Sequence, residues 1–179
     1  MTDTRSAQPL FEVSAQVPVA SSPEQVYGVV TDLARSGEWS TECRGGSWVS
    51  GDAGAVGSVF RGENYRTPEV VAWAPVVRGE WTTDSEVVAA EPARRFAWAI
   101  RTKDGKKQQS VWSFEIEPTP DGSLLTHHFR MGAPTEGIQG ITAEMSAEEK
   151  QRFFDEWAAK LERDITETLG RLKEILDKT

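Results

Sequence analysis

The residue types that most often carry out chemistry are scarce in this sequence. It has one cysteine, Cys43, and two histidines, His127 and His128, which are neighbours. One cysteine cannot form an internal disulfide or a multi-cysteine zinc site, so a structural metal is not expected. No nucleotide-binding loop, metal-ligand cluster or nucleophile triad is recognisable, and we therefore expect no cofactor.

His127 is one candidate for proton transfer. If the alternating residues 124–131 form a strand, His127 lies on the same face as the apolar Leu125 and Phe129. A histidine at a cavity wall can orient a carbonyl group or move a proton near neutral pH. The alternative is a core histidine that bonds to a neighbour, and we favour it because the sequence shows no carboxylate partner for His127.

Glu42 and Cys43 follow the first predicted helix, close to Trp39. Glu42 could act as a base if burial raised its pKa, but we expect a solvated carboxylate. Cys43 has no base that the sequence makes visible, so we interpret it as a small buried hydrophobic residue rather than a nucleophile. The catalytic residues stay unassigned, with His127 and Glu42 as the candidates.

Asn64 is a candidate for binding a ligand through hydrogen bonds. In the predicted strand at residues 57–65, it shares one face with Phe60 and Gly62. If that face is internal, the amide offers one acceptor and two donors to the oxygens of a ligand, and Gly62 leaves room beside it. The alternative, to which we give equal weight, is a hydrogen bond to local backbone at the end of the strand.

The aromatic content is unusual, with seven tryptophans and seven phenylalanines but only two tyrosines. Large rigid rings can fill a core or hold open the walls of a cavity. Ordinary core packing explains several of them, and we expect at least two to line a cavity. The candidate ligand-binding residues are Trp39, Phe60, Asn64, Trp81, Trp98, Trp112, His127, Phe153 (or its neighbour Phe154) and Trp157.

Strands supply most of the predicted framework around these side chains. Residues 11–19 alternate between apolar and polar, as in a half-buried strand. Ser21 or Ser22 can cap a helix that has Pro23 in its first turn and runs to about Leu33. Six further strands are expected, at residues 48–50, 57–65, 80–89, 96–103, 109–117 and 124–131.

Turn residues indicate how the strands connect. Asp104-Gly105 and Asp121-Gly122 are strong hairpin dipeptides, so the last three strands should form a meander. Residues 66–79 contain two prolines and are predicted to be a long loop. Residues 135–144 contain two glycines among polar residues and are predicted to be a connection to the last helix.

A long C-terminal helix is the other main element. Ser146 and Glu149 form a capping box, after which apolar residues recur at three- and four-residue steps for about 30 residues. We interpret the charged residues of this helix, Lys160 among them, as a solvated face. Because the helix must lie on a twisted sheet lined with large rings, volume should stay unfilled between the two. That volume is the candidate site of a single domain at residues 11–179, which follows a disordered start at residues 1–10.

The composition limits the partners. Twenty Lys and Arg against 28 Asp and Glu give a net charge of −8, which repels phosphate backbones, so nucleic acid is not expected. No apolar run reaches the roughly 18 residues of a membrane-spanning helix, and the start of the sequence lacks the basic and apolar segments of a signal peptide. We therefore expect a cytoplasmic protein with a small hydrophobic ligand and no membrane insertion. The oligomeric state stays open.

Seven short segments, spread in order over nearly the whole chain, carry a family resemblance. They are residues 17–26 (VPVASSPEQV), 30–33 (VTDL), 38–43 (EWSTEC), 57–64 (GSVFRGEN), 91–98 (EPARRFAW), 112–114 (WSF) and 121–126 (DGSLLT). In these segments the chain resembles the START-like, or SRPBCC, superfamily and, within it, the bacterial proteins labelled polyketide cyclase/dehydrase. The resemblance implies an α+β helix-grip fold, in which a curved antiparallel sheet wraps around a long C-terminal helix and encloses a deep cavity.

The resemblance implies three kinds of function, because members of this superfamily bind lipids, sterols, hormones or polyketides, catalyse cyclisation or dehydration, or act as co-chaperones. We expect first the binding of a small hydrophobic molecule that is aromatic, polyketide-like or lipid-like. The second possibility is a cyclase or dehydrase that folds a poly-carbonyl chain while His127 or Glu42 moves a proton. The third is a co-chaperone-like protein-interaction module, which an exposed apolar patch and a filled cavity would favour.

Overall fold

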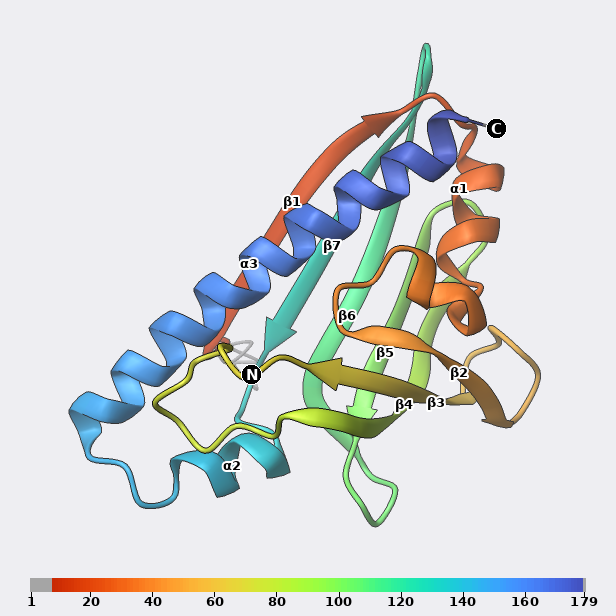
Figure 1. The fold of residues 1–179 in the computed structure, drawn as a ribbon. Helices are drawn as coiled ribbons and strands as arrows, with labels where there is room; N and C mark the ends of the chain where they lie inside the picture. Colours follow the sequence, from red (N-terminus) through yellow and green to blue (C-terminus); the bar gives the residue numbers. More distant parts are fainter. Residues whose placement is uncertain (1–7, 179) are drawn as a thin grey trace, which may run out of the picture.

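The computed structural model describes residues 8–178 and contains a curved, seven-stranded antiparallel sheet (Figure 1). Most of the expected disordered start, residues 1–7, lies outside the described residues, as does residue 179. The strand order is β1-β7-β6-β5-β4-β3-β2, so the first strand pairs with the last. The strands are β1 (Phe11–Val19), β2 (Cys43–Ser50), β3 (Val59–Arg66), β4 (Gly79–Glu91), β5 (Arg95–Arg101), β6 (Lys107–Thr119) and β7 (Gly122–Met131).

The predicted meander of the last three strands is confirmed. β5 and β6 pair around the Asp104-Gly105 turn, and β6 and β7 pair around Asp121-Gly122. Gly105 has a φ of 85° and Gly122 a φ of 151°, backbone conformations that residues with a side chain rarely adopt. The second strand is longer than expected and begins at Cys43, which places Cys43 in the sheet, opposite Asn64 of β3.

The alternation of side chains along the strands agrees with the expected faces. In β7, Leu125, His127, Phe129 and Met131 are buried, while the residues between them are partly exposed. The inward residues of β5 and β6 include Phe96 and Phe114, both fully buried. The sheet therefore presents a continuous inner surface of large side chains.

The first helix is shorter than predicted. α1 (Pro23–Val30) begins at a capping box formed by Ser22 and Gln25, and it ends three residues before Leu33. The Thr31 hydroxyl donates to the carbonyl of Tyr27 (2.7 Å), a local bond that competes with continued helix. A short 3-10 helix, η1 (Leu33–Glu38), follows and lies against β2.

A second helix forms where a connection was predicted, so that prediction was wrong. α2 (Glu136–Thr142) begins at Thr135, whose hydroxyl accepts a hydrogen bond from the Ile138 N–H (3.3 Å). Ile138 is buried. The cap and this burial outweigh the cost of two glycines in a helix, about 1 kcal/mol each.

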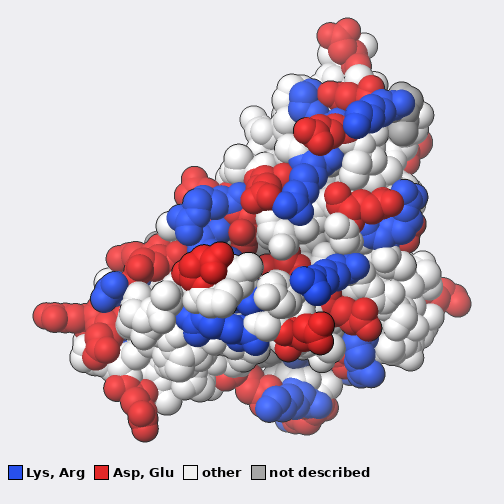
Figure 2. Space-filling model, in the orientation of Figure 1, with Lys and Arg blue, Asp and Glu red and all other residues white. Residues whose placement is uncertain are grey.

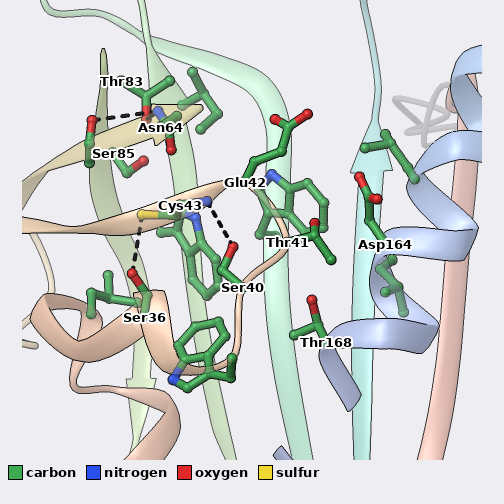
Figure 3. A pocket seen from close by; sticks show the side chains of 18 of the residues that line it. Ser36, Ser40, Thr41, Glu42, Cys43, Asn64, Thr83, Ser85, Asp164 and Thr168 are labelled. Carbon is green, nitrogen blue, oxygen red and sulfur yellow. Dashed lines mark hydrogen bonds between the residues drawn. The ribbon is translucent and has the colours of Figure 1, made fainter. Parts of the chain in front are cut away.

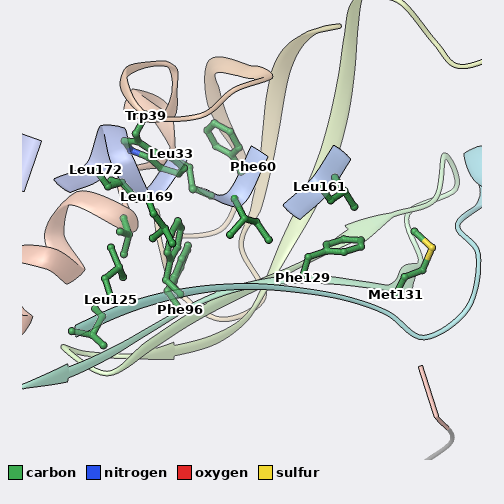
Figure 4. Close-up of a cluster of buried hydrophobic side chains, with 14 of the residues drawn as sticks. Leu33, Trp39, Phe60, Phe96, Leu125, Phe129, Met131, Leu161, Leu169 and Leu172 are labelled. Carbon is green, nitrogen blue, oxygen red and sulfur yellow. The ribbon is translucent and has the colours of Figure 1, made fainter. Parts of the chain in front are cut away.

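The long helix α3 (Ala147–Asp177) confirms the prediction from its capping box, with Ser146 and Glu149 bonded reciprocally. It crosses one face of the sheet and runs beside β1 (Figure 1). No helix within residues 8–178 is long and apolar enough to cross a membrane. The core between α3 and the sheet is shown in Figure 4, where the labelled residues include Leu33, Trp39, Phe60, Phe96, Leu125, Phe129, Met131, Leu161, Leu169 and Leu172.

Arg78 organises the long loop between β3 and β4, residues 67–78. This segment lacks strand structure, as expected, and Val71 within it has a φ of 41°, which is strained for a β-branched residue. The Arg78 guanidinium holds the loop by donating to five of its carbonyl groups. These belong to Pro68 (2.9 Å), Val70 (3.0 Å), Val71 (3.0 Å), Ala74 (3.2 Å) and Val76 (2.8 Å).

Trp73 attaches the same loop to α3. Its Nε1 donates to the Glu156 carboxylate (2.7 Å), and its ring meets the Phe153 ring edge to face at 6.5 Å. The Arg152 guanidinium also lies over the Trp73 ring, 4.4 Å from its centre. The loop is thus ordered both by its own arginine and by the first turns of α3.

Replacing Arg78 with alanine should loosen residues 67–78 without unfolding the sheet. Five carbonyl groups lose their donor, and we expect the free energy of unfolding to fall by about 1–3 kcal/mol. Hydrogen–deuterium exchange should become faster in the loop, while β6 and β7 stay protected. Arg61→Ala is the control, because Arg61 makes an exposed ion pair with Asp84 and should change neither quantity much. Unchanged exchange in the loop of the Arg78 variant would contradict this account.

Candidate functional site

Two cavities lie between the sheet and α3, with volumes of about 160 Å³ and 640 Å³. The smaller one extends toward η1, and the larger one toward α2. They are adjacent, because several residues line both. The shared residues are Glu42, Trp81, Thr83, Ile100, Trp112, Lys160 and Leu161.

The walls of the larger cavity combine rings and aliphatic side chains with polar and charged side chains. Trp81 and Trp112 of the sheet and Trp157 of α3 contribute to its walls, and Ile138 and Ile141 of α2 close one end. Its volume falls within the range of about 300–1,000 Å³ that is usual for small-molecule sites.

The smaller cavity has many polar side chains in its wall (Figure 3). Asp164 and Thr168 reach it from α3, while Asn64, Thr83 and other polar side chains reach it from the sheet. Hydroxyl, thiol and amide groups therefore surround a space about the size of one ring. Figure 3 also labels six further residues that line this cavity: Ser36, Ser40, Thr41, Glu42, Cys43 and Ser85.

A chain of four charged side chains lies where the cavities meet. The Arg66 guanidinium makes two hydrogen bonds to the Glu42 carboxylate, of 2.9 and 3.0 Å. Lys160 Nζ contacts the same carboxylate and also lies 2.6 Å from the Asp164 carboxylate. The side chains of Arg66 and Lys160 are only 7% and 8% exposed. We call these four residues the charged cluster.

Local structure explains how the charged cluster is assembled. Arg66 ends β3 on the same face as Asn64, and Trp81 and Trp157 cover it at 4.4 and 5.1 Å from their ring centres. Lys160 and Asp164 are one helical turn apart on α3. The rings shield the two cations from water and interact favourably with their charge.

The two carboxyl groups of the charged cluster respond differently to burial. Burial alone would raise the pKa of Glu42, but the hydrogen bonds and charges of Arg66 and Lys160 together hold it below its ordinary value. The pKa of Asp164 is raised, chiefly by burial, because only Lys160 opposes that effect while Glu42 adds to it. Glu42 is therefore firmly ionised. The base considered from the sequence would need a raised pKa, and the pKa of Glu42 is lowered instead.

The expected solvated states of Glu42 and Lys160 were both wrong. Glu42 is enclosed by two cations, and Lys160 is buried between carboxylates rather than on the outer face of α3. Arg66 and Asp164 were not singled out from the sequence. A signal was present for Lys160 and Asp164, since they follow Trp157 by three and seven residues and so share its helical face.

His127 matches the description of a buried core histidine, and it also lines the smaller cavity. Its Nδ1 lies 2.9 Å from the carbonyl oxygen of Ser113, so Nδ1 carries a proton and Nε2 is the acceptor. Its ring stacks on Phe114 at 4.0 Å and on Trp112 at 5.3 Å. Burial lowers the pKa of His127 to about 4, so the ring is neutral at pH 7.

Asn64 and Cys43 are both engaged locally at the wall of the smaller cavity. Asn64 Nδ2 donates to the Thr83 hydroxyl (3.1 Å) and is 3.5 Å from the Gly62 carbonyl, and neither bond uses its amide oxygen. Cys43 Sγ contacts the Ser36 hydroxyl at 3.1 Å and is only partly buried. Gly62 and Phe60 also line this cavity, on the face that the sequence indicated.

The structure brings most of the predicted aromatic residues to a cavity, with one exception. Trp39, Phe60 and Trp98 line the smaller cavity, while Trp81 and Trp112 line both. Trp157 lines the larger one. The prediction for Phe153 was wrong, because it lines neither cavity and packs in the core between Trp73 and Trp157, and its alternative Phe154 lines neither cavity. Within the described chain, no three His, Cys, Asp or Glu residues are grouped as metal ligands would be.

Lys160→Met should destabilise the protein strongly, because it leaves the buried Asp164 without its cation. Removing one partner of a buried ion pair typically costs roughly 3–5 kcal/mol, to be measured by urea denaturation. The double variant Lys160→Met/Asp164→Leu should regain much of that loss. Lys173→Met is the matched control, since its i,i+4 pair with Asp177 and its hydrogen bond to the Pro18 carbonyl are both at the surface and their loss should change little. A double variant no more stable than the single one would contradict the pairing argument.

The buried state of His127 should make the protein less stable in mild acid. As the pH falls from 7.5 to 5.0, an unfolded histidine with a pKa of about 6.5 gains a proton, whereas the folded one, with a pKa of about 4, does not. The unfolded state then binds more protons, so the free energy of unfolding should fall by about 2 kcal/mol from this group.

Urea denaturation at pH 7.5 and pH 5.0 measures this contribution of His127 to the free energy of unfolding. His127→Phe should reduce the difference in stability between pH 7.5 and 5.0, whereas His128→Gln, which alters the partly exposed neighbour, should retain it. An equal pH dependence in the wild type and the His127 variant would show that His127 is not buried as a neutral ring.

The fold agrees with that of known structures. The protein Cgl2372 from Corynebacterium glutamicum, described as Polyketide_cyc-like, is 28% identical with a TM-score of 0.63, over 93% of this chain and 91% of that one. The protein MLL2253 from Mesorhizobium loti is 19% identical with a TM-score of 0.61, over 94% and 98%. The di-domain ARO/CYC protein BexL of the BE-7585A biosynthetic pathway is 16% identical with a TM-score of 0.65, over 93% of this chain and 50% of that one.

No match is found among curated protein sequences. The family described as "Polyketide cyclase / dehydrase and lipid transport" matches residues 11–177. That range includes every strand and helix of the structure and all residues of both cavities. This chain therefore belongs to the polyketide cyclase/dehydrase and lipid transport family.

Proposed function

We propose that this protein binds a small, largely apolar molecule between its sheet and α3. The observation that carries the proposal is the cavity of about 640 Å³, whose walls include tryptophan and isoleucine side chains. A molecule of two or three fused rings has a size suited to such a space. Burying about 200 Å² of its apolar surface would contribute about 5 kcal/mol before the costs of association.

The walls of this cavity are rigid enough to keep it open. The Trp112 ring is held between His127 at 5.3 Å and Phe129 at 4.5 Å, so it cannot easily turn into the empty space. The charged cluster links β3 to α3 and sets the distance between the sheet and the helix. A cavity whose walls are fixed in advance loses little entropy when a ligand enters.

The surface supports a small-molecule ligand over a nucleic acid. On the face shown in Figure 2, acidic and basic side chains are interspersed, and no continuous basic stripe crosses it. The net charge of −8 also disfavours binding to a nucleic acid. An open cavity also favours ligand binding over the co-chaperone-like alternative, for which we expected a filled one.

A cyclase or dehydrase is the second candidate, and the charged cluster is the observation that favours it. Glu42, Lys160 and Asp164 place ionisable groups at the wall of a cavity in which a poly-carbonyl chain could be folded. The name of BexL, an ARO/CYC protein, supports the same possibility. Each of the three groups is already engaged with an opposite charge, however, so binding accounts for the geometry better than proton transfer does.

Titration with N-phenyl-1-naphthylamine, a neutral dye that fluoresces in apolar surroundings, tests the proposed binding. We expect saturable binding, with a one-to-one complex in native mass spectrometry. Ile141→Trp should weaken it at least about tenfold, because the larger ring occupies the cavity that Ile141 lines. Val49→Trp, which adds the same ring at an exposed position of β2, should leave it unchanged. Binding that does not saturate, or that ignores the Ile141 substitution, would refute the proposed site.

A further inference from the structure

Asp164 is the least firmly held charge of the charged cluster. The Glu42 carboxylate accepts two hydrogen bonds from Arg66, of 2.9 and 3.0 Å, and also contacts Lys160. Within residues 8–178, the only ion pair of Asp164 is the one with Lys160, at 2.6 Å, and it shares this cation with Glu42. Protonation of Glu42 would leave Arg66 buried without a carboxylate, whereas protonation of Asp164 leaves each cation with a partner. Asp164 is therefore the member of the cluster that loses its charge most readily.

The charged groups around Asp164 act in the same sense. Burial has the largest effect and raises the pKa of Asp164, and the negative charges of Glu42 and Glu167 raise it further. Lys160 lowers this pKa, but it divides its charge between two carboxylates. Arg66 makes its ion pair with Glu42 and not with Asp164. The position of Asp164 in the cluster thus favours uptake of a proton.

Neither histidine competes with Asp164 for this role. His127 also lines the smaller cavity, but burial lowers its pKa to about 4, so it stays neutral at pH 5.5. His128 lines neither cavity. A change of charge at the cavity wall between pH 8.0 and pH 5.5 is therefore assigned to Asp164.

The charge balance of the cluster affects which ligands can enter. The two cations balance the two carboxylates, so the cluster is neutral when all four residues are ionised. Glu42 and Lys160 line both cavities, and Asp164 lines the smaller one. Figure 3 shows Glu42 and Asp164 at this cavity, the first from the segment before β2 and the second from α3. An anionic group that entered here would add a buried charge with no free cation to balance it, which is unfavourable.

Protonation of Asp164 removes this penalty. The cluster then carries one positive charge, and Lys160 Nζ has lost one of its two carboxylate partners. An anionic group of the ligand can take the place of the Asp164 carboxylate beside Lys160, so that ligand, proton and cluster are neutral together. A ligand without charge needs no such compensation.

We propose that Asp164 takes up one proton from solvent when a ligand with an anionic group binds, and that this group replaces Asp164 as the partner of Lys160. The inference rests on the ligand binding proposed above and adds its regulation. The apolar body of the ligand lies in the larger cavity, and its anionic group lies beside Lys160, which lines both cavities. Anionic amphiphiles are then taken up in mild acid and released as the pH rises, while neutral ligands bind equally at both pH values.

Two dyes with one ring system test this coupling. They are the neutral N-phenyl-1-naphthylamine and 8-anilino-1-naphthalenesulfonate, whose added sulfonate stays ionised between pH 8.0 and pH 5.5. Both are titrated at these two pH values and at one ionic strength. Coupling to one proton changes a Kd by at most about tenfold per pH unit, and we expect the sulfonate dye to bind at least about tenfold more tightly at pH 5.5. The affinity of the neutral dye should change less than about twofold.

Substitution of Asp164 identifies the group that takes up the proton. Asp164→Asn should bind the sulfonate dye at pH 8.0 about as tightly as the wild type does at pH 5.5, and it should lose the pH dependence. Glu167→Gln is the matched control, because it removes the same charge from α3 at a side chain that is 57% exposed and outside the cluster. Glu167→Gln and His128→Gln should both retain the pH dependence. Near-UV circular dichroism at both pH values first shows that each protein is folded, since the sulfonate dye also binds partly folded states.

Two further measurements do not depend on the folding of Asp164→Asn. Calorimetry at pH 7.0, in two buffers of different ionisation enthalpy, should show proton uptake by the wild type with the sulfonate dye and none with the neutral dye. The double variant Lys160→Met/Asp164→Leu lacks both the titrating group and its cation, and it should bind the sulfonate dye weakly at both pH values. Ile141→Trp should weaken the binding of both dyes, because they share the larger cavity.

The outcomes separate this inference from the proposed function. Equal affinity of the wild type for the sulfonate dye at both pH values would overturn the proton coupling and leave apolar binding intact. A pH dependence as large as that of the wild type in folded Asp164→Asn, or in the double variant, would do the same, as would a sulfonate dye that fails to bind where the neutral dye binds. If the neutral dye does not bind, the proposed ligand binding fails and this inference fails with it.

Discussion

The ion pair between Glu42 and Arg66, extended by Lys160 to Asp164, is the interaction on which the interior of this protein depends. It connects the segment after η1, the end of β3 and the middle of α3. A carboxylate that must satisfy two cations cannot move without leaving one of them unpaired in a buried site. The interaction therefore fixes where the long helix lies above the sheet, and it forms part of the wall between the two cavities.

The surroundings of this ion pair explain why such buried charge is tolerated. Trp81 and Trp157 cover the Arg66 guanidinium with their rings, and Trp157 also lies 5.2 Å from Lys160 Nζ. The third guanidinium nitrogen of Arg66 donates to the carbonyl of Val77 at 3.2 Å. Through Val77, at the end of the loop that Arg78 organises, the order of residues 67–78 is coupled to the charged cluster and to the rim of the larger cavity.

The fold could be predicted from the sequence because local signals agreed with one another. The alternation in β7, the Asp-Gly turns and the Ser146 capping box each specify short-range structure, and few ways remain to pack one long amphipathic helix on a meander. The charged cluster could not be predicted in the same way. Glu42 and Lys160 are 118 residues apart, and a charged residue near the edge of a helical face looks the same in the sequence whether it meets water or a buried partner. The prediction for Phe153 was wrong for a related reason. Periodicity shows which face of a helix is buried, but not whether a packed core or a cavity lies against that face.

The positions of the buried polar groups indicate whether these groups serve stability or function. Replacing buried ion pairs with apolar residues of similar volume is often neutral or stabilising. A sequence shaped only for a stable core would place leucine or phenylalanine at such positions. Here the costly groups gather at the walls of the two cavities, whereas the rest of the space between α3 and the sheet is filled mainly by hydrophobic residues. Costs concentrated beside the two cavities support the ligand binding that we propose.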